Sequence, residues 1–211
     1  MPTSVCVGQL RENCYLVEDG QGGIVVIDPG DEPGRIVSAL RGHPLRLILV
    51  THYHADHTGA VEALLPSSEG GWVVGEHDYP MLQEGRPEHL GLREEPPIIS
   101  QAPARLVRDG DVIEVGDLRL RVMETPGHTP GSVCYVDDAR HIAYTGDTLF
   151  AGGCGRTDFY GGDPAAMRES LVRLSKLPEQ TQVLPGHGRT GVIAHELMMN
   201  QQMRAALGMT D

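Results

Sequence analysis

The clearest feature of the hydrophobic pattern is a run of four apolar residues at 47–50 that ends abruptly in polar side chains. A short apolar run with polar flanks predicts a strand that is buried on both faces. Alternate residues of an extended chain point the same way, so His52 and His54, just after this strand, are expected to converge on one point. Asp56 and His57 lie past the following bend and are expected to face a second point nearby.

The rest of the chain alternates short apolar segments with turn residues. In the first third this pattern is typical of a strand meander, and in the second half strands are again separated by Gly, Asp and Pro. The strands that the pattern predicts are 3–7, 13–18, 23–27, 47–50, 72–74, 112–115, 118–123, 132–136 and 142–144.

Helices are predicted where apolar residues recur every three or four positions behind a residue that can cap a helix. Asp31 and Asp163 are the expected caps of two of them, and Val37 is expected on the apolar face of the first. From 84 to 104 the chain is rich in Pro, Glu and Gly without periodicity, which predicts a surface loop or lid. The predicted helices are 31–40, 58–65, 78–83, 165–177 and a single last helix at 192–207.

Length and charge narrow the class of protein. A chain of 211 residues suits a single domain, 1–211, that buries a full core without disulfides, and its four cysteines are expected to be buried free thiols. An excess of 29 acidic over 17 basic residues disfavours nucleic acid and anionic membranes as partners. The sequence contains no apolar run long enough to span a bilayer and no secretory signal, so a cytoplasmic location is expected, while the oligomeric state stays open.

Three further ligand-type residues, His128, Asp147 and His187, each stand in a Gly-containing turn after a predicted strand. A lone His or Asp is more often a hydrogen-bonded structural residue than a metal ligand. In a layered sheet, however, these turns can meet the first cluster at one edge. Seven ligands are too many for one tetrahedral metal and suit two metals that share a carboxylate.

This motif set resembles that of the metallo-β-lactamase-fold hydrolases, and within them the short, single-domain bacterial type of glyoxalase II (hydroxyacylglutathione hydrolase). The resemblance is carried by T-H-x-H-x-D-H at 51–57, T-P-G-H-T-P-G-S at 125–132, T-G-D-T-L-F at 145–150 and P-G-H-G at 185–188. It implies an α/β fold, a four-layer αβ/βα sandwich in which two mixed sheets lie face to face with helices outside and the site lies at one edge.

The resemblance also implies the cofactor. Two divalent metal ions are expected, most readily Zn²⁺, although His and carboxylate ligands also suit iron and manganese. Asp56 and Asp147 are the expected catalytic carboxylates. One ion would be held by His52, His54 and His128, the other by Asp56, His57 and His187, with Asp147 as the bridge between them.

Such a pair lowers the pKa of a shared water towards about 7, so hydroxide is available for hydrolysis. A thiolate leaving group needs no proton because a thiol pKa is near 8.5, and no general acid is evident in the sequence. This favours a thioester or an ester over an amide, and the resemblance implies a small-molecule acyl thioester such as S-lactoylglutathione as the substrate. β-Lactam hydrolysis is disfavoured by the resemblance, because the family's lactamases generally carry a Cys at the position of Asp147.

Substrate recognition is less sharply indicated. The stretch 150–162 resembles the glyoxalase II segment in which a basic residue and a Tyr hold a glutathione carboxylate, and Arg156 and Tyr160 are the expected counterparts. An equally supported alternative is that Arg156 pairs with Asp158 to fix the loop. Only one helix is expected after His187, in place of the family's long helical extension, and Arg189 is a further basic candidate.

Two other functions stay open. Persulfide dioxygenases share the string G-C-G-R-T-D-F, here at 153–159, and bind one iron through two His and one Asp, here His52, His128 and Asp147. A metal-binding protein without activity is a further alternative, which the intact ligand set argues against. The net charge also disfavours a nuclease.

Overall fold

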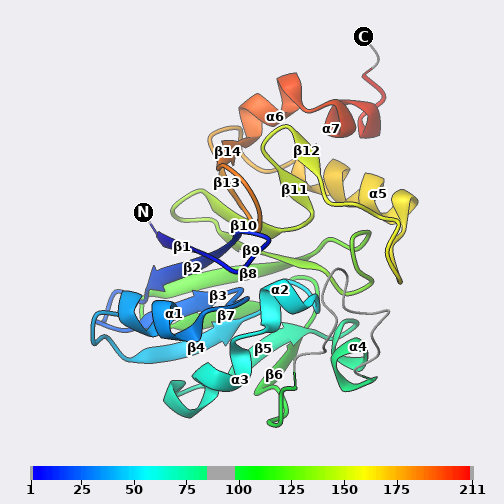
Figure 1. The fold of residues 1–211 in the computed structure, drawn as a ribbon. Coiled ribbons are helices and arrows are strands. Elements are labelled where there is room, and N and C mark those ends of the chain that lie inside the picture. Colours follow the sequence, from blue (N-terminus) through cyan, green and yellow to red (C-terminus); the bar gives the residue numbers. More distant parts are fainter. Residues whose placement is uncertain (1, 85–97, 210–211) are drawn as a thin grey trace.

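The computed structural model describes residues 2–84 and 98–209, and in them two mixed sheets lie face to face (Figure 1). The first sheet has the strand order β1-β2-β3-β4-β5-β6, antiparallel up to β3 and parallel from there on. Its strands are β1 Thr3–Val7, β2 Glu12–Glu18, β3 Ile24–Ile27, β4 Leu45–Leu49, β5 Trp72–Gly75 and β6 Arg105–Val107.

The second sheet has the order β14-β13-β10-β9-β8-β7, in which only β10 and β13 pair in parallel. A separate hairpin of β11 and β12 follows β10. The strands are β7 Val112–Val115, β8 Leu118–Glu124, β9 Val133–Asp137, β10 Ile142–Gly146, β11 Leu149–Phe150, β12 Gly153–Cys154, β13 Gln182–Pro185 and β14 Gly191–Val192.

Helices cover the outer faces of both sheets (Figure 1). Four of them and a 3-10 turn accompany the first sheet, and α5, α6 and α7 accompany the second. None of the helices within the described ranges is long and apolar enough to cross a membrane. The helices are α1 Pro33–Ala39, α2 Ala55–Thr58, α3 Val61–Leu64, η1 Leu65–Ser67, α4 Tyr79–Glu84, α5 Pro164–Leu174, α6 Ile193–Met199 and α7 Gln201–Ala206.

The strand residues explain this layering, because both faces of the central strands are apolar. In β3, Val25 and Ile27 point into the core between the sheets, whereas Ile24 and Val26 pack towards α1 and α3. On the second sheet the outer core contains residues of α5, among them Leu171. Full burial of each such side chain contributes about 1.5–3 kcal/mol. The four-layer αβ/βα sandwich expected from the resemblance is confirmed.

Several local predictions were wrong because tertiary contacts overrode the local signal. The N-cap of α1 is Glu32, not Asp31, and Val37 is 49% exposed. The helix predicted at 58–65 is divided, and its first part begins earlier, at Ala55. The single last helix breaks at Asn200, whose side-chain amide donates to the Gly153 carbonyl at 2.9 Å and whose side-chain oxygen caps α7.

Other predictions agree in part. The Asp163 side chain caps α5 by accepting from two backbone amides, as expected. All four cysteines are free, but only Cys14 and Cys134 are buried, while Cys6 and Cys154 are half-buried. The loop predicted at 84–104 falls mostly on residues 85–97, which lie outside the described residues. The pattern gave no bounds for β13, and it did not predict the short strands β6, β11, β12 and β14.

Candidate metal centre

The site lies where loops from both sheets meet. Hydrogen bonds across the sandwich fix these loops against each other: the Val133 amide donates to the Thr51 carbonyl at 2.9 Å, and the Asn13 amide donates to the Gly186 carbonyl at 2.7 Å. The Tyr15 hydroxyl adds a 2.7 Å bond to the Pro185 carbonyl. The loops that follow β4, β8, β10 and β13 are thereby held at one edge, as the sequence predicts.

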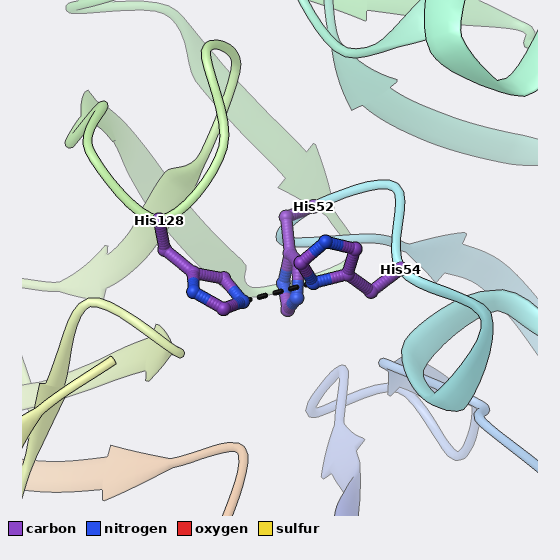
Figure 2. A group of neighbouring side chains, drawn as sticks. All are labelled: His52, His54 and His128. Atoms are coloured by element: carbon purple, nitrogen blue, oxygen red, sulfur yellow. Dashed lines mark hydrogen bonds between the residues drawn. The ribbon is translucent and has the colours of Figure 1, made fainter. Parts of the chain in front are cut away.

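Three histidines form the first group of ligand-type atoms. His52 and His54 leave the loop after β4, and His128 reaches them from the loop after β8 (Figure 2). One ring nitrogen of each lies within 4.8 Å of the others, and His128 Nε2 is 2.9 Å from His54 Nδ1. All three side chains are buried. Such a group could hold a metal ion.

The second group consists of Asp56, His57 and His187. The His187 Nε2 atom lies 3.1 Å from Asp56 Oδ2 and 3.3 Å from His57 Nε2. Asp56 and His57 stand on the short helix α2, and the His57 ring lies 4.1 Å from the His52 ring between centroids, so the second group is adjacent to the first. The bend predicted after His54 is therefore a helix start.

Asp147 joins the two groups. Its Oδ1 atom lies 3.4 Å from His57 Nε2, and its Oδ2 atom lies 3.6 Å from both His128 Nε2 and His187 Nε2. One carboxylate therefore faces ligand-type atoms of both groups. The structure thus brings together all seven residues that the sequence singled out.

The rings of His128 and His187 are oriented by hydrogen bonds from their Nδ1 atoms to backbone carbonyls. His128 Nδ1 donates to the Arg156 carbonyl at 2.7 Å, and His187 Nδ1 donates to the Leu10 carbonyl at 3.1 Å. Because a carbonyl only accepts, each Nδ1 carries a hydrogen, which leaves Nε2 of the neutral ring with a free lone pair. An outer partner of this kind is typical of a metal-binding His.

Asp28, which the sequence analysis did not single out, orients two of the histidine rings. Its carboxylate lies 3.0 Å from His57 Nδ1 and accepts from the Thr51 hydroxyl at 2.7 Å. That hydroxyl lies 3.1 Å from His52 Nδ1, so Asp28 also fixes His52 through Thr51. Asp28 has a φ of 52°, a left-handed conformation that Asp tolerates better than most residues. Such strain is concentrated at functional sites.

The chemistry of the cluster fits cations. His52 Nε2 and Asp147 Oδ1 are buried and have no hydrogen-bond partner among the described residues, a costly state that a metal ion relieves. Burial lowers the pKa of His54 to about 3 and also lowers the pKa of His52, so both rings are neutral, as ligation requires. The cluster is therefore able to hold metal ions.

Glu12 is another residue that the sequence analysis missed. It is 1% exposed, and neither carboxylate oxygen has a hydrogen-bond partner among residues 2–84 and 98–209. Burial raises its pKa well above the ordinary value, although the nearby His57 opposes this shift. Glu12 stands next to Asp28 and His57 with a ligand-type atom of each within 4.8 Å. Its position at the start of a mostly apolar strand carried no signal for a site.

Asp78 ties the two histidine loops together. Its buried carboxylate accepts from the Tyr53 amide at 2.9 Å, from the Thr129 hydroxyl at 2.7 Å and from the Gly131 amide at 2.6 Å. Tyr53 lies between His52 and His54 in the chain, and Thr129 follows His128. Asp78 therefore positions the first ligand group without touching it.

Asp78→Ala is expected to lower the free energy of unfolding by at least about 3 kcal/mol, because three buried donors lose their acceptor at about 1–3 kcal/mol each. Urea unfolding of wild type and variant measures this difference, and equal stabilities would contradict the positioning role. Metal affinity should fall about 10- to 100-fold, as when other outer partners of metal ligands are removed.

The pH dependence gives an independent check. Burial raises the pKa of Asp78 to about 6 despite its three hydrogen bonds. The folded protein therefore holds this proton to higher pH than the unfolded chain, whose Asp pKa is about 3.9. Relative to Asp78→Asn, which does not titrate, wild type should lose up to about 3 kcal/mol of stability as the pH rises from about 4 through about 6. A difference that is constant across this range would contradict the raised pKa.

A cleft of about 430 Å³ opens onto the cluster. Arg156 lies on its wall, but its guanidinium makes two 2.6 Å hydrogen bonds to the Asp158 carboxylate and stacks on the Phe159 ring at 3.9 Å. Tyr160 is half-exposed, and its backbone carbonyl accepts from the Tyr53 hydroxyl at 3.0 Å. The described residues that line the cleft are Leu10, His54, Asp56, His128, Asp147, Phe150, Gly155, Arg156, Phe159 and His187, so Tyr160 and Arg189 are not among them.

Comparison with protein families and curated sequences agrees with this geometry. The family model "Metallo-beta-lactamase superfamily" matches residues 7–187. Hydroxyacylglutathione hydrolase GloC of Haemophilus influenzae is 32% identical over 201 residues, which are 92% of this chain and 93% of that protein. The hydroxyacylglutathione hydrolase of Hahella chejuensis is 36% identical over 179 residues, 83% of this chain but only 61% of the longer relative.

Solved structures are also similar. The BLEG-1 B3 metallo-beta-lactamase has a TM-score of 0.90 at 29% identity and covers 96% of this chain and 99% of its own. TTHA1623 in a di-iron-bound form has a TM-score of 0.81 at 35% identity, covering 94% and 98%. ETHE1 from Myxococcus xanthus has a TM-score of 0.80 at 28% identity, covering 97% and 85%.

Proposed function

Because the chain belongs to the metallo-beta-lactamase superfamily, we propose that it cleaves acyl thioesters such as S-lactoylglutathione with the help of two divalent metal ions. Its relatives and its family make it a metallo-hydrolase; the substrate and the number and identity of the metals are the proposal. Zn²⁺ suits the ligands best, with iron and manganese as alternatives. The observation that carries the proposal is the Asp147 carboxylate, which faces His57 at 3.4 Å and His128 at 3.6 Å.

Each ligand-type residue has a specific role in this proposal. His52, His54 and His128 would hold one ion, Asp56, His57 and His187 the other, and Asp147 would serve both. When bound, the metal pair supplies a hydroxide near neutral pH and polarises the substrate carbonyl. Asp28 fixes the His57 ring, and through Thr51 the His52 ring, so these ligands need little reorganisation during the reaction.

The chemistry of the leaving group favours thioesters over amides as substrates. A thiolate departs without a proton because thiol pKa values are near 8.5, whereas an amine must be protonated. The cleft therefore needs no separate acid for this reaction. Arg156 stays our candidate for binding an anionic part of the substrate, although this requires it to leave or share Asp158. Tyr160 is the weaker candidate, because it lies outside the cleft lining.

A second candidate is an iron-dependent persulfide dioxygenase that uses His52, His128 and Asp147. The His128 and Asp147 side chains are 3.6 Å apart, and the similarity to ETHE1 supports keeping this alternative. A mononuclear iron site of this kind would not use Asp56, His57 and His187 as metal ligands. The similarity to TTHA1623, solved in a di-iron-bound form, supports a two-metal site even if the metal is iron.

Elemental analysis of the purified protein, combined with three assays, tests the proposal. We expect about two metal ions per chain, as in two-metal hydrolases, and hydrolysis of S-lactoylglutathione or a related thioester. One iron per chain with oxygen uptake on addition of glutathione persulfide would replace the proposal by the second candidate. Turnover of a chromogenic cephalosporin without thioester cleavage would make the protein a lactamase.

His187→Ala separates the two candidates at the level of residues. If the second group holds an ion that the reaction needs, the rate of thioester hydrolysis should fall by more than roughly 10- to 100-fold, the loss typical of removing a hydrogen-bond partner of a metal ligand. In a mononuclear dioxygenase of His52, His128 and Asp147, iron and oxygen uptake should both survive. Substitution of the exposed His195 by Ala is the matched control and should change neither activity nor metal content.

A further inference from the structure

The residues that line the cleft beside the ligand-type cluster indicate which class of thioester it can bind. The chain contains only two phenylalanines, and both line the cleft. The Phe159 ring lies edge-on to His54 at a centroid distance of 5.8 Å, and the Phe150 ring lies edge-on to His187 at 6.3 Å. One aromatic wall therefore stands beside each group of ligand-type residues.

The wall on the His187 side is apolar. Leu10 contributes to it with a side chain that is 42% exposed, while its backbone carbonyl accepts from His187 Nδ1. Phe150 is half-buried on the same side. Apolar surface that faces water beside a binding site is stabilised when an apolar group covers it, in proportion to the area removed from water.

The wall on the His54 side is different, because it combines Phe159 with an ion pair. Among the cleft-lining residues that the structure describes, Arg156 is the only Lys or Arg. Asp158 neutralises it through two hydrogen bonds of 2.6 Å. Apart from the ligand-type side chains, the described part of the cleft lining therefore offers a substrate no unpaired charge.

A thioester carbonyl placed at the cluster extends in two directions, its acyl group one way and its thiol the other. We propose that the acyl group lies against Leu10 and Phe150 and is uncharged and apolar, such as a short branched alkyl chain, while the thiol lies along Arg156 and Phe159. This inference rests on the proposed thioester hydrolysis and names the acyl class that the cleft selects. A polar 2-hydroxyacyl group loses hydration of its hydroxyl at this wall, which has no hydrogen-bonding side chain to replace it.

Isobutyryl and lactoyl thioesters test the proposal, because they differ only in a methyl group against a hydroxyl group at the same carbon. Each acyl group is joined to glutathione and to the uncharged thiol N-acetylcysteamine, and kcat/KM is measured for all four. With either thiol, we expect isobutyryl to be preferred about 10- to 100-fold, the range over which an apolar pocket discriminates such a pair. A lactoyl substrate that is cleaved as fast or faster would overturn the acyl assignment and leave thioester hydrolysis standing.

Leu10→Asn assigns the preference to the wall. The substitution keeps the number of side-chain heavy atoms, and the backbone carbonyl of residue 10 can still accept from His187, but the side chain becomes polar. The preference for isobutyryl should therefore shrink about tenfold, mainly through loss of isobutyryl turnover. Leu106→Asn is the matched control, because Leu106 is 37% exposed and is not part of the cleft lining. An unchanged preference in Leu10→Asn would overturn the inference. Protein with two bound metals that cleaves none of the four thioesters would overturn the proposed function and the inference together.

Discussion

Asp147→Ala is expected to lose bound metal and to lower kcat for thioester hydrolysis by about a thousandfold or more, the upper range for removing one electrostatic stabiliser from an active site. Asp147 lies against rings of both groups, 3.4 Å from His57 Nε2 and 3.6 Å from His128 Nε2. In the proposed two-ion site, loss of this carboxylate would leave the repulsion between the two cations less compensated. Metal content after dialysis and steady-state kinetics measure both effects.

The control for this prediction is Asp158→Ala. Asp158 is exposed and pairs with Arg156 outside the cluster, so its loss should leave the metal content unchanged. If Arg156 binds an anionic part of the substrate, freeing it from Asp158 should lower KM for glutathione thioesters but not for N-acetylcysteamine thioesters. Turnover and metal content that survive in Asp147→Ala would remove the basis of the whole site assignment.

The second large effect is expected from Gly30→Ala. A Cβ atom at this position would lie 1.5 Å from the Asp56 carbonyl oxygen and 2.5 Å from its carbonyl carbon. Because backbone atoms cannot rotate away, helix α2 must move, and with it the side chains of Asp56 and His57. We expect loss of metal from the second group, loss of activity, and a decrease of at least about 1–3 kcal/mol in the free energy of unfolding, the usual cost of overpacking.

Gly34→Ala is the matched control for this substitution. It lies four positions further on, within α1, and an added Cβ there meets nothing within 4 Å. Replacing Gly by Ala inside a helix should raise the free energy of unfolding by about 0.5–1 kcal/mol and leave metal binding unchanged. Urea unfolding and elemental analysis of both variants decide the outcome. A Gly30→Ala protein with wild-type stability and metal content would show that α2 does not depend on this close approach.

The local pattern predicted the sheets better than the helices. Strands such as β3 and β9 are short apolar runs between turn residues. Their side chains are buried on both faces of the sheet, so a continuous apolar run was the correct signal for a strand. The sequence predicts one continuous helix at 58–65 and another at 192–207, because the apolar spacing typical of a helix runs through each segment without interruption. Asn200 interrupts the latter only because its buried amide reaches Phe150 and Gly153, and that contact is not local.

The ligand-type residues could be found from the sequence because metal chemistry needs particular side chains, and those of His52 to His57 stand close together after a buried strand. Asp28 and Asp78 could not be found, because each is a single carboxylate in a turn. Their importance comes from partners far away in the chain, His57 for Asp28 and the two loops at Tyr53 and Gly131 for Asp78.

By itself the sequence predicted the ligand-type residues and most of the strands, because residue type and hydrophobic period are local properties, while the layered fold was implied by the resemblance of its motifs to a known family. Only the tertiary structure showed that Asp28 orients His57, that Asp78 joins the two histidine loops, and that Leu10 and Phe150 stand beside His187. These relations depend on distances between loops of different strands, and such distances are fixed by the packing of the whole sandwich rather than by any one segment.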